Sequence, residues 1–319
     1  MQFCGAVRYR LPLNIETAKD VLVEIEPADS AVYKNLLSNP DIQPTVTDAV
    51  WLPSITHAES ISKTPDSRVV LHFHGGAYVL NSPRDDSMQY GPKKLCEMQL
   101  ADAVLCPTYR LSSGPRSSYP AQLQDAITAY DYLIKNRKNS PSQIILSGDS
   151  AGAHLAILLL RHLMVNPELG LPLPRALLLY SPWLDLTPEG IRINDKNERD
   201  YLTEECLGWG ATTFTPVGVS PTEEFISPGL HSFKSPVPVW VQAGAAEVFY
   251  PAITRWVEEM RKAGSTIDLH DMKDMPHNIF VVGGAFALDD EVSRAIKAAK
   301  MFLETINLNS AVEKSGCRL

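Results

Sequence analysis

The pentapeptide GDSAG (148–152) lies between two apolar segments, QIILS (143–147) and AHLAILLLRHLMV (153–165). The first segment predicts a strand and the second a helix, so the pentapeptide forms a strand-to-helix turn. Glycine at each end permits a turn tight enough to hold up the side chain of Ser150. We therefore expect Ser150 to be a nucleophile; the alternative is an ordinary connecting turn.

Segments of strand character alternate with segments of helix character on both sides of this turn. Such alternation predicts an α/β fold with a mostly parallel sheet and helices on both of its faces. Besides the segments around Ser150, the expected strands lie at 69–74, 103–107, 175–181, 237–244 and 266–272, and the expected helices at 121–138, 253–264 and near 288–306.

Two segments interrupt the alternation. Residues 1–42 precede the first core strand, and residues 185–235 are rich in Pro, Gly, Thr and Glu. Open α/β sheets place their sites at the carboxyl edge of the strands, so we expect both segments to form a cap there. The alternative is two surface excursions. The expected organisation is an N-terminal cap segment (1–42), a core (43–184 and 236–308), a cap insertion (185–235) and a flexible C-terminal tail (309–319).

Composition bounds the class of protein. The 319 residues are 45% hydrophobic and 21% charged, which permits a large buried core, and the net charge is −8. The acidic balance argues against nucleic acid or an anionic membrane as partner and favours a small-molecule substrate, with a homodimer left open. The five scattered cysteines are typical of reduced thiols in an intracellular protein. Neither a signal peptide nor a membrane span is expected from the sequence.

A second glycine motif, HFHGGAYVLNSP (72–83), directly follows a predicted strand. Acyl-transfer chemistry needs N–H donors that converge on an oxyanion, and glycines let a backbone approach a substrate closely. We expect the donors to be Gly75, Gly76, Ala77 and Ala151. The alternatives are a simple loop, or a metal pair formed by the histidines of this segment; because no third ligand is evident, no metal is predicted.

Together these motifs resemble a known family. HGGA (74–77) and GDSAGAHLA (148–156), with YRL (109–111), YPAQLQDA (119–126), SPWLDL (181–186) and MPHNIF (275–280), are similar to the hormone-sensitive-lipase family of α/β-hydrolases. These are carboxylesterases with a cap domain. The resemblance covers most of residues 70–305 and implies the α/β-hydrolase fold, with a nucleophile, an acid and a histidine in that chain order.

The resemblance also locates the acid and the base. Glu247 follows the strand at 237–244, where many relatives have Asp and a second acidic residue four positions on; here that later position is Pro251. The alternative is that Glu247 is a surface residue and that Asp271 or Asp274 is the acid. Of the eight histidines, His277 in the loop KDMPHNIF (273–280) follows the last predicted strand and occupies the family's histidine position.

These residues predict a serine hydrolase that cleaves a carboxylic ester of a small or medium acyl group, including deacetylation of a natural product, through a Ser150–His277–Glu247 triad and an acyl-enzyme. The same triad also fits acyl transfer or ring closure, and a non-catalytic receptor is a third alternative. No cofactor is implied. The resemblance implies that the cap lines the substrate pocket, so Trp209, Phe214 and Phe225 of the insertion suggest an apolar cavity; the alternative is that these rings serve only packing.

The chain ends on Cys317-Arg318-Leu319, a small, a basic and a leucine residue. Peroxisomal import receptors read C-terminal tripeptides of this type. The sequence therefore leaves two locations open, peroxisome and cytoplasm, and a chance ending is the alternative to a signal.

Overall fold

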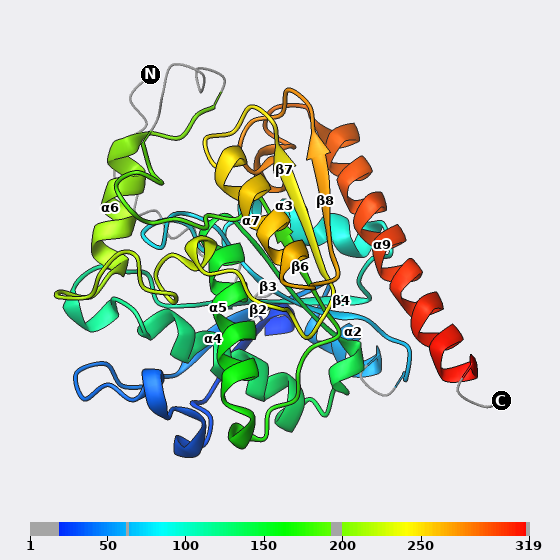
Figure 1. Cartoon of the computed structure of the whole chain (residues 1–319). Helices are drawn as coiled ribbons and strands as arrows, with labels where there is room; N and C mark the ends of the chain where they lie inside the picture. The colour runs from blue at the N-terminus through cyan, green and yellow to red at the C-terminus, as the bar shows by residue number, and fades with distance from the viewer. Residues whose placement is uncertain (1–18, 62–63, 193–199, 317–319) are drawn as a thin grey trace.

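The computed structural model describes residues 19–61, 64–192 and 200–316, with side chains as far as residue 306. Within them lies an eight-stranded sheet in the order β1-β2-β4-β3-β5-β6-β7-β8 (Figure 1). β1–β2 and β2–β4 pair antiparallel, and the other neighbours pair parallel. The strands are β1 (Leu22–Ile25), β2 (Thr47–Leu52), β3 (Val69–Phe73), β4 (Ala103–Thr108), β5 (Ile144–Asp149), β6 (Ala176–Tyr180), β7 (Val239–Gly244) and β8 (Ile267–Met272).

Four neighbouring strands of the parallel part of the sheet, β3, β5, β6 and β7, have mostly apolar sequences. Every residue of β3, β5, β6 and β7 is buried. A parallel strand covered by helices on both faces has no solvent side, so it does not alternate apolar and polar residues. The predicted α/β fold is confirmed.

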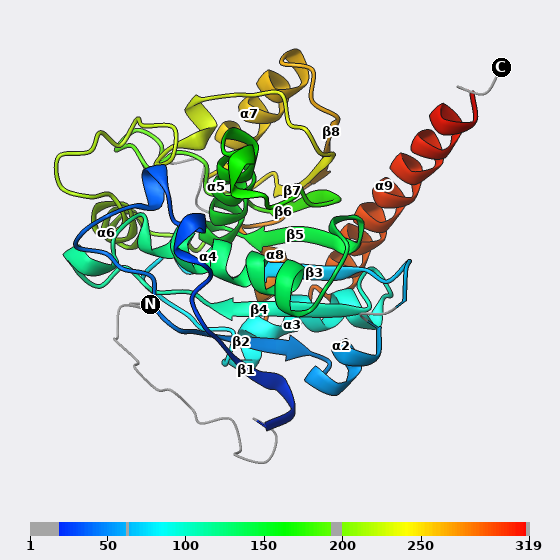
Figure 2. The same ribbon diagram turned by 90° about the horizontal axis from the view of Figure 1, so that it is seen from below.

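Helices cover both faces of the sheet (Figures 1 and 2). α4, α5 and α7 pack on one face, and α3, α8 and α9 on the other, which divides the buried apolar residues into two clusters. α6 belongs to the insertion and lies far from α9 in Figure 1. The helices are α2 (Ile55–Ile61), α3 (Asp86–Glu97), α4 (Ala121–Asp131), α5 (Ala151–Val165), α6 (Glu204–Phe214), α7 (Tyr250–Lys262), α8 (Ile279–Val282) and α9 (Asp289–Gly316).

The segment 1–42 differs from the expected cap over its described part. β1 pairs with β2, with Leu22 opposite Val50, so it extends the sheet and satisfies backbone groups of β2. Farther along, Gln124 of α4 donates hydrogen bonds to the carbonyls of Leu37 (2.9 Å) and Ile42 (2.8 Å). Residues 22–42 therefore pack against the core, and residues 1–18 lie outside the described residues.

The C-terminal boundary differs too. α9 continues to Gly316, so residues 309–316, expected as a flexible tail, are helical. The segment NLNSAVEKS (307–315) contains neither Gly nor Pro, and the helix ends at a glycine, which is a common helix terminator. The tripeptide Cys317-Arg318-Leu319 lies outside the described residues. None of the helices in the described ranges combines the length and apolar character needed to cross a membrane.

Candidate active site

Ser150 occupies the turn between β5 and α5, at the carboxyl edge of the sheet. Its backbone has φ 52° and ψ −119°, a conformation that residues other than glycine rarely adopt. Neighbouring backbone atoms leave no room for a side chain at the two flanking glycines. A Cβ at Gly152 would lie 1.9 Å from the carbonyl oxygen of Phe73 in β3, and one at Gly148 would lie 2.3 Å from the carbonyl carbon of Gly152. The predicted tight turn is thus present, with a strained serine at its apex.

The structure brings Ser150, His277 and Glu247 together. His277 Nε2 lies 2.9 Å from Ser150 Oγ, and His277 Nδ1 lies 2.7 Å from Glu247 Oε2. Because a carboxylate can only accept, the tautomer that fits both contacts has its proton on Nδ1 and leaves Nε2 to accept from the serine hydroxyl. The three side chains thus form one continuous hydrogen-bonded relay.

Glu247 is held in place independently of the histidine. Its Oε1 accepts a hydrogen bond of 3.0 Å from the backbone N–H of Gly244, at the end of β7. Burial raises the pKa of Glu247 above its ordinary value, while hydrogen bonds and charge from His277, and a hydrogen bond from Ser181, act in the opposite direction. Since Glu247 is only 1% exposed, solvent does not compete for its carboxylate.

Asp149, the residue before the nucleophile, ties three segments together. Its Oδ2 accepts from the Gly75 N–H at 2.9 Å and from Asn278 Nδ2 at 2.7 Å, and its Oδ1 lies 3.1 Å from His72 Nε2. The buried carboxylate requires such donors. The prediction of Gly75 as an oxyanion donor is therefore corrected: its N–H already donates to Asp149.

The other three predicted oxyanion donors differ from Gly75, because their N–H groups are not bonded to any described residue. Gly76 has φ +114° and Ala77 φ +50°, which turns the backbone sharply after β3. Among the described residues, no acceptor is bonded to the N–H groups of Gly76, Ala77 and Ala151. A Cβ on Gly75 would lie 3.0 Å from Ser150 Cβ, so this loop adjoins the nucleophile. Three N–H groups thus have no acceptor in the described ranges: two in the loop that adjoins Ser150 at Gly75, and that of Ala151 at the N-terminus of α5.

His72, near the end of β3, and His74, in the loop after it, bond to other groups. His72 bonds to Asp149 and, at 3.1 Å, to Ser147 Oγ, while His74 Nδ1 donates to the Gly75 carbonyl at 2.7 Å. Burial lowers the pKa of His74 to about 4, so the ring is neutral at pH 7. In the part of the chain that the structure describes, no cluster of three or more His, Cys, Asp or Glu is arranged to hold a metal.

The insertion packs directly on the glycine loop. A Cβ on Gly210 of α6 would lie 2.3 Å from the Ala77 carbonyl oxygen, and the Phe214 ring stacks on Tyr78 at 4.1 Å. Of the aromatic residues expected to line a cavity, Phe214 and Phe225 are buried in the core, while Trp209 is 50% exposed. Phe214 and Phe225 therefore contribute to packing.

Another aromatic residue of the insertion, which the sequence reasoning missed, lies beside the histidine. The Tyr201 ring centroid is 6.0 Å from that of His277 and 6.3 Å from that of Phe286. Tyr201 is 43% exposed and Phe286 55% exposed. The sequence signal that could have found Tyr201 is its position in the insertion, shortly before the helix α6 that packs on the glycine loop.

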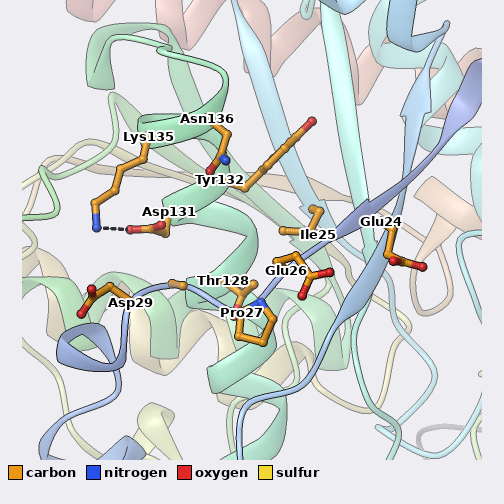
Figure 3. A pocket seen from close by; sticks show the side chains of 11 residues that line it. Glu24, Ile25, Glu26, Pro27, Asp29, Thr128, Asp131, Tyr132, Lys135 and Asn136 are labelled. Atoms are coloured by element: carbon orange, nitrogen blue, oxygen red, sulfur yellow. Dashed lines mark ion pairs between the residues drawn. The ribbon is translucent and has the colours of Figure 1, made fainter.

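A cavity of about 410 Å³ lies elsewhere (Figure 3). Its walls come from β1 and the residues after it and from the end of α4, where residues 132–136 form a π-helical turn. Four of its eleven lining residues are acidic, and one of these, Asp131, is paired with Lys135 at 2.7 Å. None of its lining residues belongs to the relay or the glycine loop, so we place the candidate active site at Ser150.

Comparison with known proteins shows the family of this chain. A family profile described as alpha/beta hydrolase fold matches residues 70–281, a range that includes Ser150, Glu247 and His277. An acetyl-hydrolase of Streptomyces hygroscopicus is 32% identical over 240 residues, which cover 75% of this chain and 76% of that protein. An esterase of Acinetobacter venetianus is 26% identical over 303 residues, covering 94% and 93%.

Solved structures of esterases have a similar fold. A mutant of the esterase E40 superimposes with a TM-score of 0.65 at 26% identity, covering 81% of this chain and 82% of the other. A hormone-sensitive lipase from a metagenome library has a TM-score of 0.64 at 25% identity, with the same coverage. The chain belongs to the α/β-hydrolase family, in the hormone-sensitive-lipase-like group that its motifs resemble.

Proposed function

We propose that this protein hydrolyses carboxylic esters of small or medium acyl groups, acetyl esters of natural products included, with Ser150 as nucleophile. The observation that carries the proposal is the relay in which His277 lies 2.9 Å from Ser150 Oγ and 2.7 Å from Glu247 Oε2. The names of the relatives, an acetyl-hydrolase and an esterase, support the same reaction.

The relay supports a two-step mechanism. His277 Nε2 takes the hydroxyl proton while Ser150 Oγ attacks the ester carbonyl, and it then returns that proton to the leaving alcohol. Water then attacks the acyl-enzyme while the same nitrogen takes its proton; that proton passes to Ser150 Oγ as the ester bond to the serine breaks and the acid is released. Glu247 accepts the Nδ1–H bond throughout and stabilises the imidazolium.

Negative charge on the carbonyl oxygen needs fixed donors. The N–H groups of Gly76, Ala77 and Ala151 are available for this purpose, since they have no acceptor among the described residues. Each such donor contributes about 3 kcal/mol to transition-state stabilisation in comparable hydrolases. The positive end of the α5 dipole lies at Ser150, the residue directly before that helix.

The proposal is tested with p-nitrophenyl esters of increasing acyl length. We expect turnover of the short esters, and we expect Ser150→Ala to lower kcat/KM by a factor on the order of 10⁵ or more while the protein stays folded. Retention of near-normal turnover in that variant would refute the role of Ser150. Product analysis with an added alcohol measures acyl transfer, which uses the same acyl-enzyme.

Two narrower expectations stay predictions from the sequence. These are a homodimer and recognition of Cys317-Arg318-Leu319 by a peroxisomal import receptor. A fluorescent fusion that keeps the C-terminus free tests the second one, because punctate fluorescence is expected if the tripeptide acts as an address and diffuse fluorescence if it does not.

A further inference from the structure

Asp200 lies in the insertion, just before α6, and its carboxylate joins the two loops that carry Glu247 and His277. Oδ2 accepts a hydrogen bond of 2.8 Å from the backbone N–H of Val248. Oδ1 accepts one of 3.1 Å from the backbone N–H of His277 and one of 2.9 Å from that of Tyr201. One side chain therefore binds the residue after the acid and the base itself.

These contacts fix a critical distance. Glu247 and His277 lie on separate connections that follow β7 and β8, and the bond between their side chains depends on how those connections are spaced. Hydrogen bonds between backbone N–H groups and a charged carboxylate are stronger than those between neutral groups. Asp200 thus clamps both ends of the Glu247–His277 bond from the backbone side.

The acid loop does not supply this acceptor itself. The four residues after Glu247 are Val248, Phe249, Tyr250 and Pro251, and none of them is acidic. The carboxylate instead comes from 48 residues before Val248 and 77 before His277. The next residue, Tyr201, places its ring beside that of His277, so residues 200 and 201 contact the histidine through both its backbone and its side chain.

We propose that Asp200 is a positioning residue for the relay, through which the insertion holds Glu247 and His277 at bonding distance. The inference rests on the proposed ester hydrolysis, but the geometry it describes exists without substrate. It makes the insertion part of the catalytic apparatus as well as a cover over the glycine loop.

The kinetic test compares Asp200→Ala and Asp200→Asn with the wild type on p-nitrophenyl acetate. Alanine removes both clamping bonds, and we expect kcat to fall about 10- to 100-fold with KM within about twofold, because misplaced catalytic groups slow chemistry without removing binding contacts. Asparagine keeps one acceptor oxygen but turns an NH₂ group toward the other N–H, so its kcat should fall between those of wild type and alanine.

Matched controls come from the same insertion. Glu205 is exposed in the first turn of α6, so Glu205→Ala and Glu205→Gln remove an equal charge without touching either loop. We expect both controls to retain wild-type kcat. Thermal melting shows that each variant is folded at the assay temperature; if alanine prevents folding, the comparison of Asp200→Asn with Glu205→Gln decides.

A second readout needs no substrate. The proton between His277 Nδ1 and Glu247 gives a low-field NMR resonance, assigned by its loss in His277→Gln. We expect Asp200→Ala to shift or broaden this resonance and the Glu205 variants to leave it unchanged. An unshifted resonance together with control-like kcat would overturn the positioning role of Asp200. A wild type that cleaves no ester would instead contradict the proposed function, and the resonance would still decide the inference.

Discussion

The residues of the relay each have one identifiable support. Ser150 is raised by a turn that only glycines can flank, Glu247 is anchored by the N–H of Gly244, and His277 is held through its backbone by Asp200. The sequence predicted the relay because the turn around Ser150 has glycine at each end, and because the family resemblance places the acid and the base after two later strands, β7 and β8. It could not predict the bonds of Asp149 or Asp200, because these carboxylates accept from groups far away in the chain, which no motif spacing encodes.

Substitution of Glu247 tests the acid at this scale. Glu247→Gln should lower kcat on the order of a thousandfold or more, because an amide can turn its NH₂ toward Nδ1, misorient the ring and leave the imidazolium without a counter-charge. Steady-state kinetics on p-nitrophenyl acetate measure the effect.

Asp271→Asn serves as the control for that substitution. Asp271 is exposed and accepts from Tyr250 Oη at 2.7 Å, so its loss should leave kcat unchanged. Full activity of Glu247→Gln combined with a loss in Asp271→Asn would transfer the acid role to Asp271.

At the scale of elements, β5, the turn and α5 form the unit that exposes Ser150. α5 runs so close to β3 that the backbones of Gly152 and Phe73 are in contact. Apolar patterning located both elements, since buried parallel strands and helices carry long apolar runs. It missed β1, which has only four residues, and the π-helical turn that ends α4, because neither has a periodicity of its own.

Gly152→Ala tests the close approach. The new Cβ would lie 1.9 Å from the Phe73 carbonyl oxygen, a backbone atom, so α5 or β3 must move. We expect the free energy of unfolding in urea to drop by about 3 kcal/mol or more, with loss of activity.

Gly114→Ala is the matched control for the close approach. A Cβ at Gly114 meets no atom within 4 Å, so the free energy of unfolding of this variant should stay within about 0.5 kcal/mol of the wild-type value. Equal stability of the two variants would contradict the proposed packing constraint.

At the scale of the whole molecule, the parallel sheet brings the residues of the site together. β3, β5, β7 and β8 all point the same way, so the glycine loop, Ser150, Glu247 and His277 meet at one edge although they span more than 200 positions of the chain. Alternation of strands and helices was enough to predict this edge. The packing of α6 on Ala77 was not predictable, since the insertion has no regular pattern and its position is decided by tertiary contacts.

The most direct measurement of the central claim is mass spectrometry of the intact protein after reaction with a fluorophosphonate, in which a serine oxygen displaces fluoride from phosphorus. We predict one adduct per chain, located by peptide mapping on Ser150, with esterase activity lost in proportion to labelling and no adduct on Ser150→Ala. An adduct on another residue that accounts for the lost activity, or full labelling of Ser150 with activity retained, would contradict the account.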